Sequence, residues 1–496
     1  MSKLLTIYFT SDTHGYLYPT NFCDERPRPM GLLAMSFPKD GNTLVIDGGD
    51  TLQGSPLSYY CHAQGRPLPA AAALNQKGYD FVTLGNHDFN YGRENLRAHL
   101  EALDARCLCA NVRDLRGELP LEACAIRTLE NGLRVGIIGV ATRWITLWEK
   151  PENLVDFEIT DPVEAMRATV ERLRPQVDVL VGVYHGGVER DLETGEALSD
   201  TDENLACEIC ERYPFDLLLT GHQHIAMAGK TYRGVHLVQP PCNATAYVKV
   251  EMDERRAFHS ELCAVPDSAA LTPAQSALLS ELNLWLDRPI GALNRPLWPE
   301  EKIDMALNGS PIADFFNMVQ MEISGAQLSC TCLANELRGF DQKVSVRDVV
   351  ASYAYSNTLV VLEVTGAVLK QALEQCARYF EMDESGPRVA KSFLQPKEAH
   401  YNYDYFYGVD YVFDLRRPEG ARVTALSYAG KPVTDEMRFT LCMNNYRATG
   451  AGDFPFYAEC PRVREINTEV SELILDYFTR HPQVTVDPHR WLRCVH

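Results

Sequence analysis

Six short aliphatic runs occur in the first half of the chain, and helical patterns separate them. The runs are LLTIYF, TLVID, FVTLG, VGIIGV, VLVGVY and DLLLTG. Apolar runs of this length, alternating with helical segments, are typical of strands joined by crossover helices. Because the runs are almost wholly apolar, the strands should be covered on both faces. The first half is therefore predicted to have an α/β fold.

The pattern changes after about residue 250. The segment TPAQSALLSELNLWLDRPIG predicts a single amphipathic helix that ends before Pro289. A chain of 496 residues also exceeds the size at which one hydrophobic core stops growing. We therefore predict two domains, residues 1–265 and 291–496, joined by a linker helix within 266–290. The second domain mixes helical patterns such as SPIADFFNMVQ with strand patterns such as TLVVLEV, which favours an α+β fold.

Polar side chains that can bind metal ions follow five of the six aliphatic runs, at the point where each run ends. They are Asp12, His14, Asp50, Asn86, His87, His185, His222 and His224. In open α/β sheets, ligands bind beyond the carboxyl ends of the strands, so these segments should converge on one crevice. Imidazole, carboxylate and amide groups suit Mn, Zn, Fe or Co. Without His87 there are seven candidate ligands, too many for one ion and enough for two that share a carboxylate.

The charge of the chain limits its partners. There are 47 Lys and Arg against 67 Asp and Glu, a net charge of -20 that repels nucleic acid polymers. The first residues, MSKLLTIYFTSD, lack the features of a signal peptide, and no apolar run approaches the roughly 20 residues of a membrane span. The fifteen cysteines are odd in number and scattered, which suits a reducing compartment. These features predict a cytoplasmic protein without a membrane partner.

The polar segments also resemble the motifs of a known family, the calcineurin-like metallophosphoesterases. SDTHG, GGDTLQGSP, GNHDFNYG, VYHGG and TGHQH match the pattern of that family in order. GDTLQGSPL and GNHDFNYG are similar to its branch of 5′-nucleotidases and 2′,3′-cyclic-nucleotide phosphodiesterases, as are SVRDVVASYAYSNTLVVLEVTG and MNNYRATGAGDF in the second half. The resemblance implies a β-sandwich flanked by helices, followed by an α+β nucleotide-binding domain.

The resemblance assigns a role to each polar residue of the first half. One metal ion would be bound by Asp12, His14 and His224, the second by Asn86, His185 and His222, and Asp50 would bridge both. A hydroxide between the ions would attack the phosphorus, so no protein nucleophile is required. His87 would stabilise the phosphoryl group and protonate the leaving oxygen. Some family members carry an Asp three residues after this histidine, whereas this chain has Asn90, as the cyclic-nucleotide branch does; the group that orients His87 is left unassigned.

The second half is expected to recognise the nucleoside. Relatives stack the base between two aromatic rings, and the matching positions are Tyr446 and Tyr401, with Tyr403 as a rival to Tyr401. Arg338 and Asp453 would contact the sugar or the phosphate. Because substrate would then contact both domains, the linker helix is expected to act as a hinge.

The resulting interpretation is a cytoplasmic dimetal hydrolase of nucleotide phosphoesters that serves nucleotide catabolism. It would act as a 5′- or 3′-nucleotidase, as a 2′,3′-cyclic-nucleotide phosphodiesterase, or as both. One alternative is a pyrophosphatase of nucleotide sugars or dinucleotides. An alternative of another class is a nucleotide-binding sensor that has lost turnover. The preferred substrate, the metal and the oligomeric state are left open by the sequence.

Overall fold

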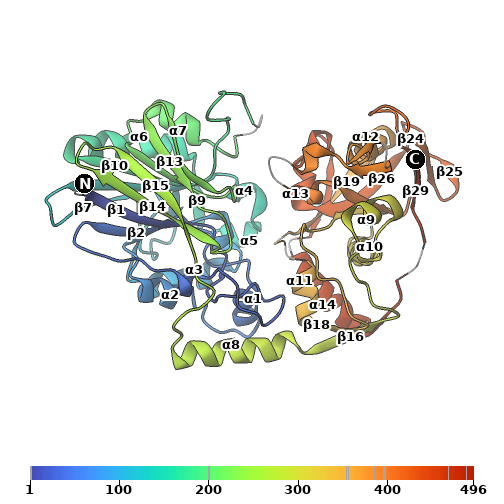
Figure 1. Ribbon diagram of the computed structural model, residues 1–496, viewed down its shortest axis with the longest axis horizontal. Coiled ribbons are helices and arrows are strands. Elements are labelled where there is room, and N and C mark those ends of the chain that lie inside the picture. The colour runs from blue at the N-terminus through green and yellow to red at the C-terminus, as the bar shows by residue number, and fades with distance from the viewer. Residues whose placement is uncertain are drawn as a thin grey trace. The chain divides into compact units, whose positions relative to one another are not determined.

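The computed structural model describes residues 3–198, 202–353, 355, 357–383, 386–394, 398–466, 468–486 and 489–496. The chain divides into two units, residues 1–282 and 283–496, and this boundary lies inside helix α8, Pro273–Leu286 (Figure 1). The helix that the sequence predicts before Pro289 is therefore present. Its role as a hinge and the domain limits at residues 265 and 291 stay predictions.

Unit 1 contains two sheets. The first has seven strands in the order β15 (Phe258–Ala264), β14 (Ala246–Asp253), β1 (Lys3–Thr10), β2 (Thr43–Asp47), β3 (Phe81–Val82), β4 (Arg106–Leu108) and β6 (Leu121–Glu122). The second has six in the order β12 (Met227–Tyr232), β13 (Val235–Gln239), β11 (Leu217–Thr220), β10 (Val179–His185), β8 (Arg134–Ala141) and β7 (Cys124–Thr128). Strands β1, β2 and β3 are parallel, as are β8, β10 and β11, so each set ends at one edge of its sheet.

The aliphatic runs of the sequence form the inside of a sandwich between these two sheets. Alternate residues such as Ile7 and Phe9 of β1 share one buried cluster with Val181 and Val183 of β10. The intervening residues of the second sheet, such as Leu180, pack instead into a cluster with helices α6 (Pro162–Leu173) and α7 (Ala206–Arg212). The strands of the second sheet are thus covered on both faces, as the near-continuous apolar runs predict, and the predicted α/β class is confirmed.

Helices and short strands complete unit 1. They are α1 (Pro56–Ala63), α2 (Ala70–Lys77), α3 (Gly92–Ala102), α4 (Ile145–Trp148), α5 (Pro151–Leu154), α6 (Pro162–Leu173), α7 (Ala206–Arg212), the 3-10 helices η1 (Leu32–Ala34), η2 (Asn86–Phe89) and η3 (Arg174–Gln176), and the strand pair β5 (Val112–Asp114) and β9 (Phe157–Ile159). Helix α6 shows how the sequence sets a boundary: the Asp161 carboxylate accepts from the Glu164 N–H at 3.0 Å, and Pro162 occupies the first helical position.

Unit 2 has a larger sheet and several smaller ones. The five-stranded sheet has the order β22 (Asp404–Tyr407), β17 (Leu328–Cys332), β26 (Arg438–Asn444), β19 (Leu359–Thr365) and β27 (Arg462–Ile466). The others are β25 (Lys431–Pro432), β24 (Val423–Tyr428), β23 (Asp410–Asp414) and β29 (Leu492–Val495); β18 (Lys343–Ser345), β16 (Pro289–Leu293) and β28 (Gln483–Val484); and β20 (Phe380–Asp383) with β21 (Gly386–Val389). Its helices are α9 (Lys302–Asn308), α10 (Pro311–Ser324), α11 (Val346–Ser352), α12 (Gly366–Ala377), α13 (Asn445–Ala448), α14 (Val470–Arg480), η4 (Lys391–Phe393), η5 (His400–Asn402) and η6 (Pro455–Tyr457). This is the α+β unit that the sequence predicts.

Hydrogen bonds connect each end of α8 to its own unit. In unit 1, the Tyr18 hydroxyl donates to the Gln275 carbonyl at 2.9 Å. In unit 2, the buried Arg347 guanidinium donates from Nε to Asp287 at 2.6 Å, just after the helix ends. Helix α8 is therefore held by specific bonds on both sides of the unit boundary.

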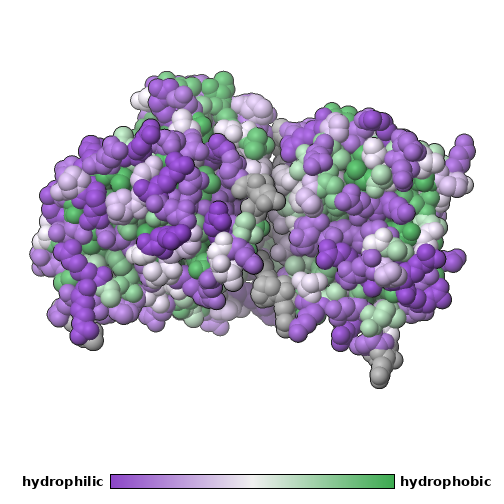
Figure 2. Space-filling model, turned by 90° about the horizontal axis from the view of Figure 1, so that it is seen from above, coloured by the Kyte–Doolittle hydropathy of each residue, from purple (hydrophilic) through white to green (hydrophobic). Residues whose placement is uncertain are grey.

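Among the described residues, no helix is long and apolar enough to cross a bilayer. In the view of Figure 2, hydrophilic residues cover most of the surface of both units, and hydrophobic residues are scattered among them. All fifteen cysteines are free thiols.

Candidate dimetal centre

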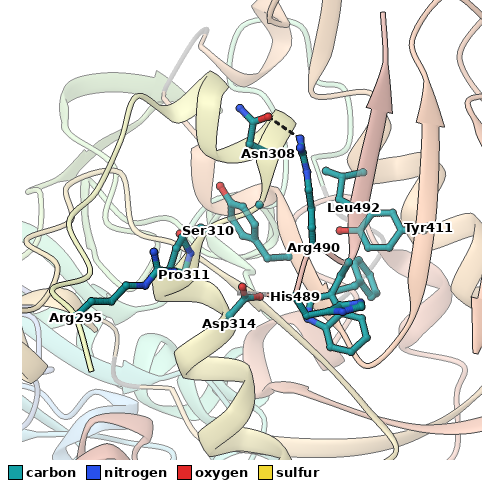
Figure 3. A pocket seen from close by; sticks show the side chains of 13 residues that line it. Arg295, Asn308, Ser310, Pro311, Asp314, Tyr411, His489, Arg490 and Leu492 are labelled. Atoms are coloured by element: carbon teal, nitrogen blue, oxygen red, sulfur yellow. Dashed lines mark hydrogen bonds between the residues drawn. The ribbon is translucent and has the colours of Figure 1, made fainter. Parts of the chain in front are cut away.

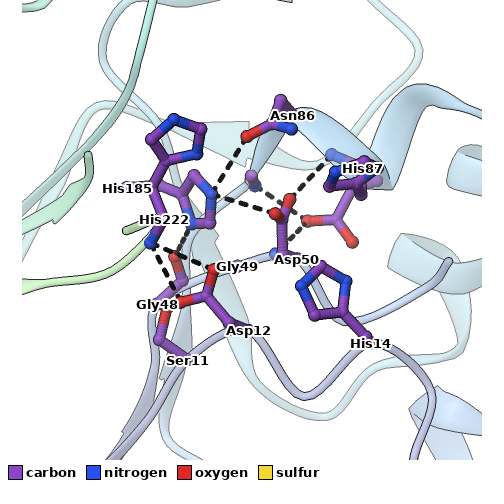
Figure 4. A network of polar contacts seen from close by, with 12 residues as sticks. Ser11, Asp12, His14, Gly48, Gly49, Asp50, Asn86, His87, His185 and His222 are labelled. Carbon is purple, nitrogen blue, oxygen red and sulfur yellow. Dashed lines mark hydrogen bonds and ion pairs between the residues drawn. The ribbon is translucent and has the colours of Figure 1, made fainter. Parts of the chain in front are cut away.

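The strand ends of unit 1 bring the predicted polar residues together. Asp12 and His14 lie in the turn after β1, Asp50 follows β2, Asn86 and His87 lie on η2 after β3, His185 is the last residue of β10, and His222 and His224 follow β11. Figure 4 shows Asp12, His14, Asp50, Asn86, His87, His185 and His222 close to one another. The structure therefore places all eight residues in one region, as their positions after the predicted strands suggest.

Two groups of three side chains could each hold an ion. Asp12, His14 and His224 form one group and Asp50, His185 and His222 the other, with candidate ligand atoms within 4.8 Å of one another in each group. In the first group, His14 Nε2 lies 3.1 Å from His224 Nε2. In the second, His185 Nε2 lies 3.2 Å from both Asp50 Oδ2 and Asn86 Oδ1. Asn86, the seventh predicted ligand, thus adds an amide oxygen to the second group.

The backbone at these turns adopts a conformation that is costly for residues other than glycine. Asp12, His14, Asp50, His222 and His224 have positive φ angles between 49° and 71°. Such left-handed conformations cost of order 1 kcal/mol each and persist where the surroundings impose them, often at functional sites. At Asp50 the surroundings are closely packed: a Cβ on Gly85 would lie 2.1 Å from Asp50 Oδ1. The glycines of the GGD and GNH segments thus let the turns after β2 and β3 approach each other.

Hydrogen bonds to the outer ring nitrogens orient the histidines. His14 Nδ1 lies 2.9 Å from the Gln53 carbonyl, and His185 Nδ1 lies 2.7 Å from the Gly48 carbonyl. Carbonyl oxygens only accept, so both Nδ1 atoms carry the hydrogen and both Nε2 atoms are left as ligands. His222 Nε2 faces Glu203 Oε1 at 2.9 Å, which leaves Nδ1 as its candidate ligand atom.

Glu203 is a residue that the sequence motifs do not reveal. It lies in the loop before α7, and its carbonyl accepts from the hydroxyls of Thr142 at 3.1 Å and Tyr184 at 3.3 Å. Metal-binding histidines usually donate their second ring N–H to a carboxylate or a carbonyl. Only the spatial pairing of this loop with His222 identifies Glu203, because nothing in its sequence neighbourhood carries a signal.

The electrostatics of the centre favour cations. Asp12 and Asp50 are 0% and 1% exposed, and within the described ranges neither has a Lys or Arg partner. Burial acts to raise the pKa of each carboxyl, but the neighbouring histidines, His224 and His185 for Asp12 and His185 and His87 for Asp50, outweigh it and hold both pKa values below the usual range. Burial lowers the pKa of His14 to about 4, so its ring is neutral. Two ionised, buried carboxylates beside the neutral His14 ring are a fitting ligand set for divalent ions.

His185 carries the opposite shift. Burial lowers the pKa of its imidazole, yet the Asp50 carboxylate dominates and raises that pKa to about 10. The imidazolium thus balances the charge of Asp50. A divalent cation bound at Asp50 would take over that balance and return His185 to the neutral form that a ligand requires.

Asp88 stabilises the backbone around the candidate metal ligands. Its carboxylate accepts from the backbone N–H groups of Asp50 at 3.0 Å, Thr51 at 2.9 Å, Leu52 at 3.0 Å and Gly85 at 2.8 Å. These four bonds join the turn after β2 to the turn after β3. Asp88 therefore holds the backbone and is not the group that orients His87.

The orienting group for His87 is Asn90. His87 Nδ1 lies 2.7 Å from Asn90 Oδ1. The His87 ring is half-buried and meets the His14 ring edge-on, with 5.3 Å between the centroids. His87 thus borders the ligand groups without belonging to either of them.

The predicted nucleoside residues all lie in unit 2. Tyr446 is 43% exposed on α13, and Tyr401 is half-buried on η5. The buried Arg447 guanidinium donates to the Tyr401 carbonyl at 2.9 Å and pairs with Asp404 at 2.8 Å, so it ties both segments to β22. The rival residue Tyr403 is only 2% exposed, and its hydroxyl donates to the Ala306 carbonyl at 3.0 Å, so its ring belongs to the core.

The other two predicted residues of unit 2 differ in exposure and contacts. Asp453 is exposed and has a φ of 70°, beside the half-buried Gly452. Arg338 donates from Nε to the buried Asp348 carboxylate at 2.9 Å, so its guanidinium is anchored on α11. The roles of both residues toward a sugar or a phosphate stay predictions.

A cavity of about 150 Å³ lies elsewhere in unit 2 (Figure 3). Its walls include Arg295, Asp314, Tyr411 and Arg490, and none of the four predicted nucleoside residues lines it. The Asp314 carboxylate stands among the arginines in this view, so the wall carries charges of both signs. This cavity is distinct from the predicted base-binding surface.

Comparison with known proteins gives two family matches and several relatives. Residues 5–226 match the calcineurin-like phosphoesterase family, and residues 289–459 match the 5′-nucleotidase C-terminal domain. The structure is similar to that of a candidate 5′-nucleotidase of Staphylococcus aureus, with 31% identity, a TM-score of 0.83, and coverage of 99% of this chain and 100% of the other.

Two curated relatives extend the comparison. A 2′,3′-cyclic-nucleotide 2′-phosphodiesterase/3′-nucleotidase of Haemophilus influenzae is 24% identical over 98% of this chain and 86% of its own length. A trifunctional nucleotide phosphoesterase of Bacillus subtilis is also 24% identical over 98% of this chain, which spans only 38% of that protein.

Proposed function

We propose that this chain, which belongs to the 5′-nucleotidase family of calcineurin-like phosphoesterases, hydrolyses nucleotide phosphoesters with two bound divalent metal ions. The observation that carries the proposal is the convergence of two ligand groups beside His87 at the strand ends of unit 1. A protein that only bound nucleotides would have no use for this arrangement. The substrates we propose are 5′- and 3′-nucleotides and 2′,3′-cyclic nucleotides.

The residues would divide between the two ions as the motifs suggest. Asp12, His14 and His224 would hold the first ion, and His185, His222 and Asn86 the second, with Asp50 shared. The donor set favours Mn, Zn, Co or Fe. Bound there, two cations would supply the Lewis acidity that polarises a phosphoryl group and activates water. Asp88 and the carbonyls behind His14 and His185 keep the ligands in place.

His87 would act on the leaving group. As the phosphorus–oxygen bond to the leaving oxygen breaks, negative charge builds up on that oxygen, and His87 Nε2–H can neutralise it by donating its proton. The bond between His87 Nδ1 and Asn90 fixes the ring so that Nε2 is directed away from Asn90. His87 is thus the residue to which we assign the general acid.

Unit 2 would supply nucleoside recognition. Tyr446 and Tyr401 offer accessible ring surface, and Arg447 connects the segments that carry them. A base stacked on an aromatic ring gains about 1 to 3 kcal/mol with little dependence on base identity. Broad base specificity would follow.

Tyr446→Ala should raise KM for nucleotides by about 10-fold or more, because one stack is lost. Steady-state kinetics would measure this change. KM for p-nitrophenyl phosphate, which lacks a nucleoside, should stay unchanged, and Tyr446→Phe, which keeps the ring, should behave like the wild type. Equal losses on both substrates would mean that Tyr446 supports the fold of unit 2 instead of the base.

A substrate screen tests the proposed function itself. The chelator-treated protein would be supplied with Mn, Co, Zn or Mg and offered AMP as the 5′-, 3′- and 2′,3′-cyclic forms, a nucleotide sugar and a dinucleotide, with products followed by chromatography. We expect turnover of at least one mononucleotide. Cleavage of the sugar nucleotide or dinucleotide alone would favour a pyrophosphatase, and nucleotide binding without any product would indicate a sensor.

A further inference from the structure

Glu149 is a buried carboxylate near the centre that no motif includes. It is 8% exposed and follows helix α4. In the parts of the chain that the structure describes, it forms no ion pair with Lys or Arg. Its Oε1 accepts from the Lys150 N–H at 2.7 Å and from Asn153 Nδ2 at 2.9 Å, and its Oε2 accepts from Asn90 Nδ2 at 2.6 Å.

The contact with Asn90 connects this carboxylate to His87. Asn90 presents one end of its amide to each neighbour: Nδ2 to Glu149 and Oδ1 to His87 Nδ1 at 2.7 Å. Asn153 Nδ2 also donates to the Asn90 carbonyl at 3.2 Å, so the backbone and the side chain of Asn90 are both held by this group. The side chains of Glu149, Asn90 and His87 thus form a continuous chain of hydrogen bonds.

The chemistry of the partners fixes the direction of every bond in this chain. A carboxylate accepts and does not donate, so Glu149 selects the NH2 end of the Asn90 amide. The opposite end is then the carbonyl oxygen, which can only accept from His87. Nδ1 of His87 must therefore carry hydrogen, and a flipped amide would set two oxygens against each other at the Glu149 end.

We infer that Glu149 is a positioning residue for catalysis, which acts through the Asn90 amide to hold His87 with hydrogen on Nδ1. The inference rests on the proposed function in taking His87 as the proton donor. The bond to Asn90 is compatible with each stage of the transfer. In the imidazolium both nitrogens carry hydrogen; when the Nε2–H bond breaks and the leaving oxygen gains the proton, the neutral Nδ1–H ring remains. The proton that the attacking water releases to solvent balances the one that Nε2 later regains from solvent.

In this chain the neighbour of His87 is not an acid but the Asn90 amide, which is itself hydrogen-bonded to the Glu149 carboxylate. The aspartate that some family members carry three residues after this histidine would accept from Nδ1 by itself, in either orientation of its carboxyl. Asn90 can accept only if its amide is the right way round. The carboxylate that settles this orientation is supplied from a different segment, the turn between α4 and α5.

Glu149→Gln tests the inference with almost no change in size. A glutamine can donate as well as accept, so the Asn90 amide becomes free to flip and His87 can take the tautomer with hydrogen on Nε2. We expect kcat for a nucleotide to fall by about 10-fold or more, with KM and metal content unchanged. p-Nitrophenyl phosphate, whose leaving group needs no proton, should lose much less. The matched control is Glu374→Gln in unit 2, where a carboxylate accepts from the Arg422 and Val423 N–H groups at 3.0 and 2.8 Å; it should leave kcat unchanged.

A double variant tests the direction of the bonds. In Asn90→Asp with Glu149→Gln, the glutamine NH2 can donate to the new carboxylate at position 90, which still accepts from His87, so kcat should recover towards the wild type. Asn90→Asp alone sets two carboxylates against each other and should not recover activity. Wild-type kcat in Glu149→Gln, or a double variant no better than the single one, would overturn the inference.

Nitrogen NMR of 15N-histidine-labelled protein gives a readout that does not depend on turnover. The His87 signals can be assigned by their loss in His87→Ala. At a pH where the His87 ring is neutral, the wild type should show hydrogen on Nδ1, and Glu149→Gln a mixture of both tautomers. If the wild type hydrolyses no nucleotide but Glu149→Gln changes the His87 tautomer as expected, the proposed function fails and the positioning role of Glu149 stands. An unchanged tautomer would overturn the chain itself.

Discussion

Replacing His87 by alanine should lower kcat for a nucleotide by about 10²- to 10⁴-fold, the usual contribution of a general acid. The loss is expected because the alkoxide of a ribose is a poor leaving group without a proton. Metal content should not change, since His87 belongs to neither ligand group. Steady-state kinetics and metal analysis of the purified variant would measure both quantities.

The leaving group provides the control for this prediction. p-Nitrophenolate departs without a proton, so p-nitrophenyl phosphate should lose far less activity in His87→Ala than a nucleotide does. His259→Ala, on the exposed side of β15, should behave like the wild type with both substrates. If both substrates suffer equally in the His87 variant, His87 has a role other than protonation.

Asp50→Asn should abolish turnover and reduce the bound metal to one ion or none. Asp50 is the carboxylate assigned to both ions, and an amide offers one neutral oxygen in place of two charged ones. The backbone of the turn should survive, because four N–H groups around Asp88 hold it independently of the Asp50 side chain. Metal analysis by plasma mass spectrometry would count the ions.

His62→Ala is the matched control for Asp50→Asn. The His62 ring stacks on Tyr91 with 4.2 Å between centroids, and it belongs to neither ligand group. This variant should keep wild-type activity and metal content. Two ions retained in Asp50→Asn would contradict the bridging assignment.

The sequence predicts those parts of the centre that follow from local patterns. The apolar runs predict the strands, and the polar residues directly after them predict which side chains meet, because parallel strands end at one edge of a sheet. Strand β3 is shorter than its run suggests, since only Phe81 and Val82 pair before the chain enters the turn. The ligand positions are unaffected, because Asn86 lies at the same end of the strand.

Residues that act from loops cannot be found in this way. Glu203 and Glu149 meet His222 and Asn90 across separations of 19 and 59 residues, and neither lies at the end of a strand. The left-handed turns at Asp12, Asp50 and His222 also have no sequence signature, because these residues are not glycines. Only the packing of distant segments determines these features.

The tyrosines of unit 2 show the same limit. The segment HYNYDYFYGVDY offers several candidate rings, and the sequence does not separate Tyr401 from Tyr403. Burial separates them, because Tyr403 packs in the core while Tyr401 remains partly accessible. Tyr401 lies on η5, whereas Tyr403 lies between the end of η5 and the start of β22. The run of aromatic residues in the sequence does not indicate this boundary.

A metal titration of the chelator-treated protein tests the dimetal hydrolase most directly. Mn or Co would be added in steps, and bound metal and hydrolysis of the best mononucleotide would be measured on the same samples. We predict no turnover without metal, binding of two equivalents, and activity that appears only as the second equivalent binds. Full activity without added metal, or with a single bound ion, would contradict the account.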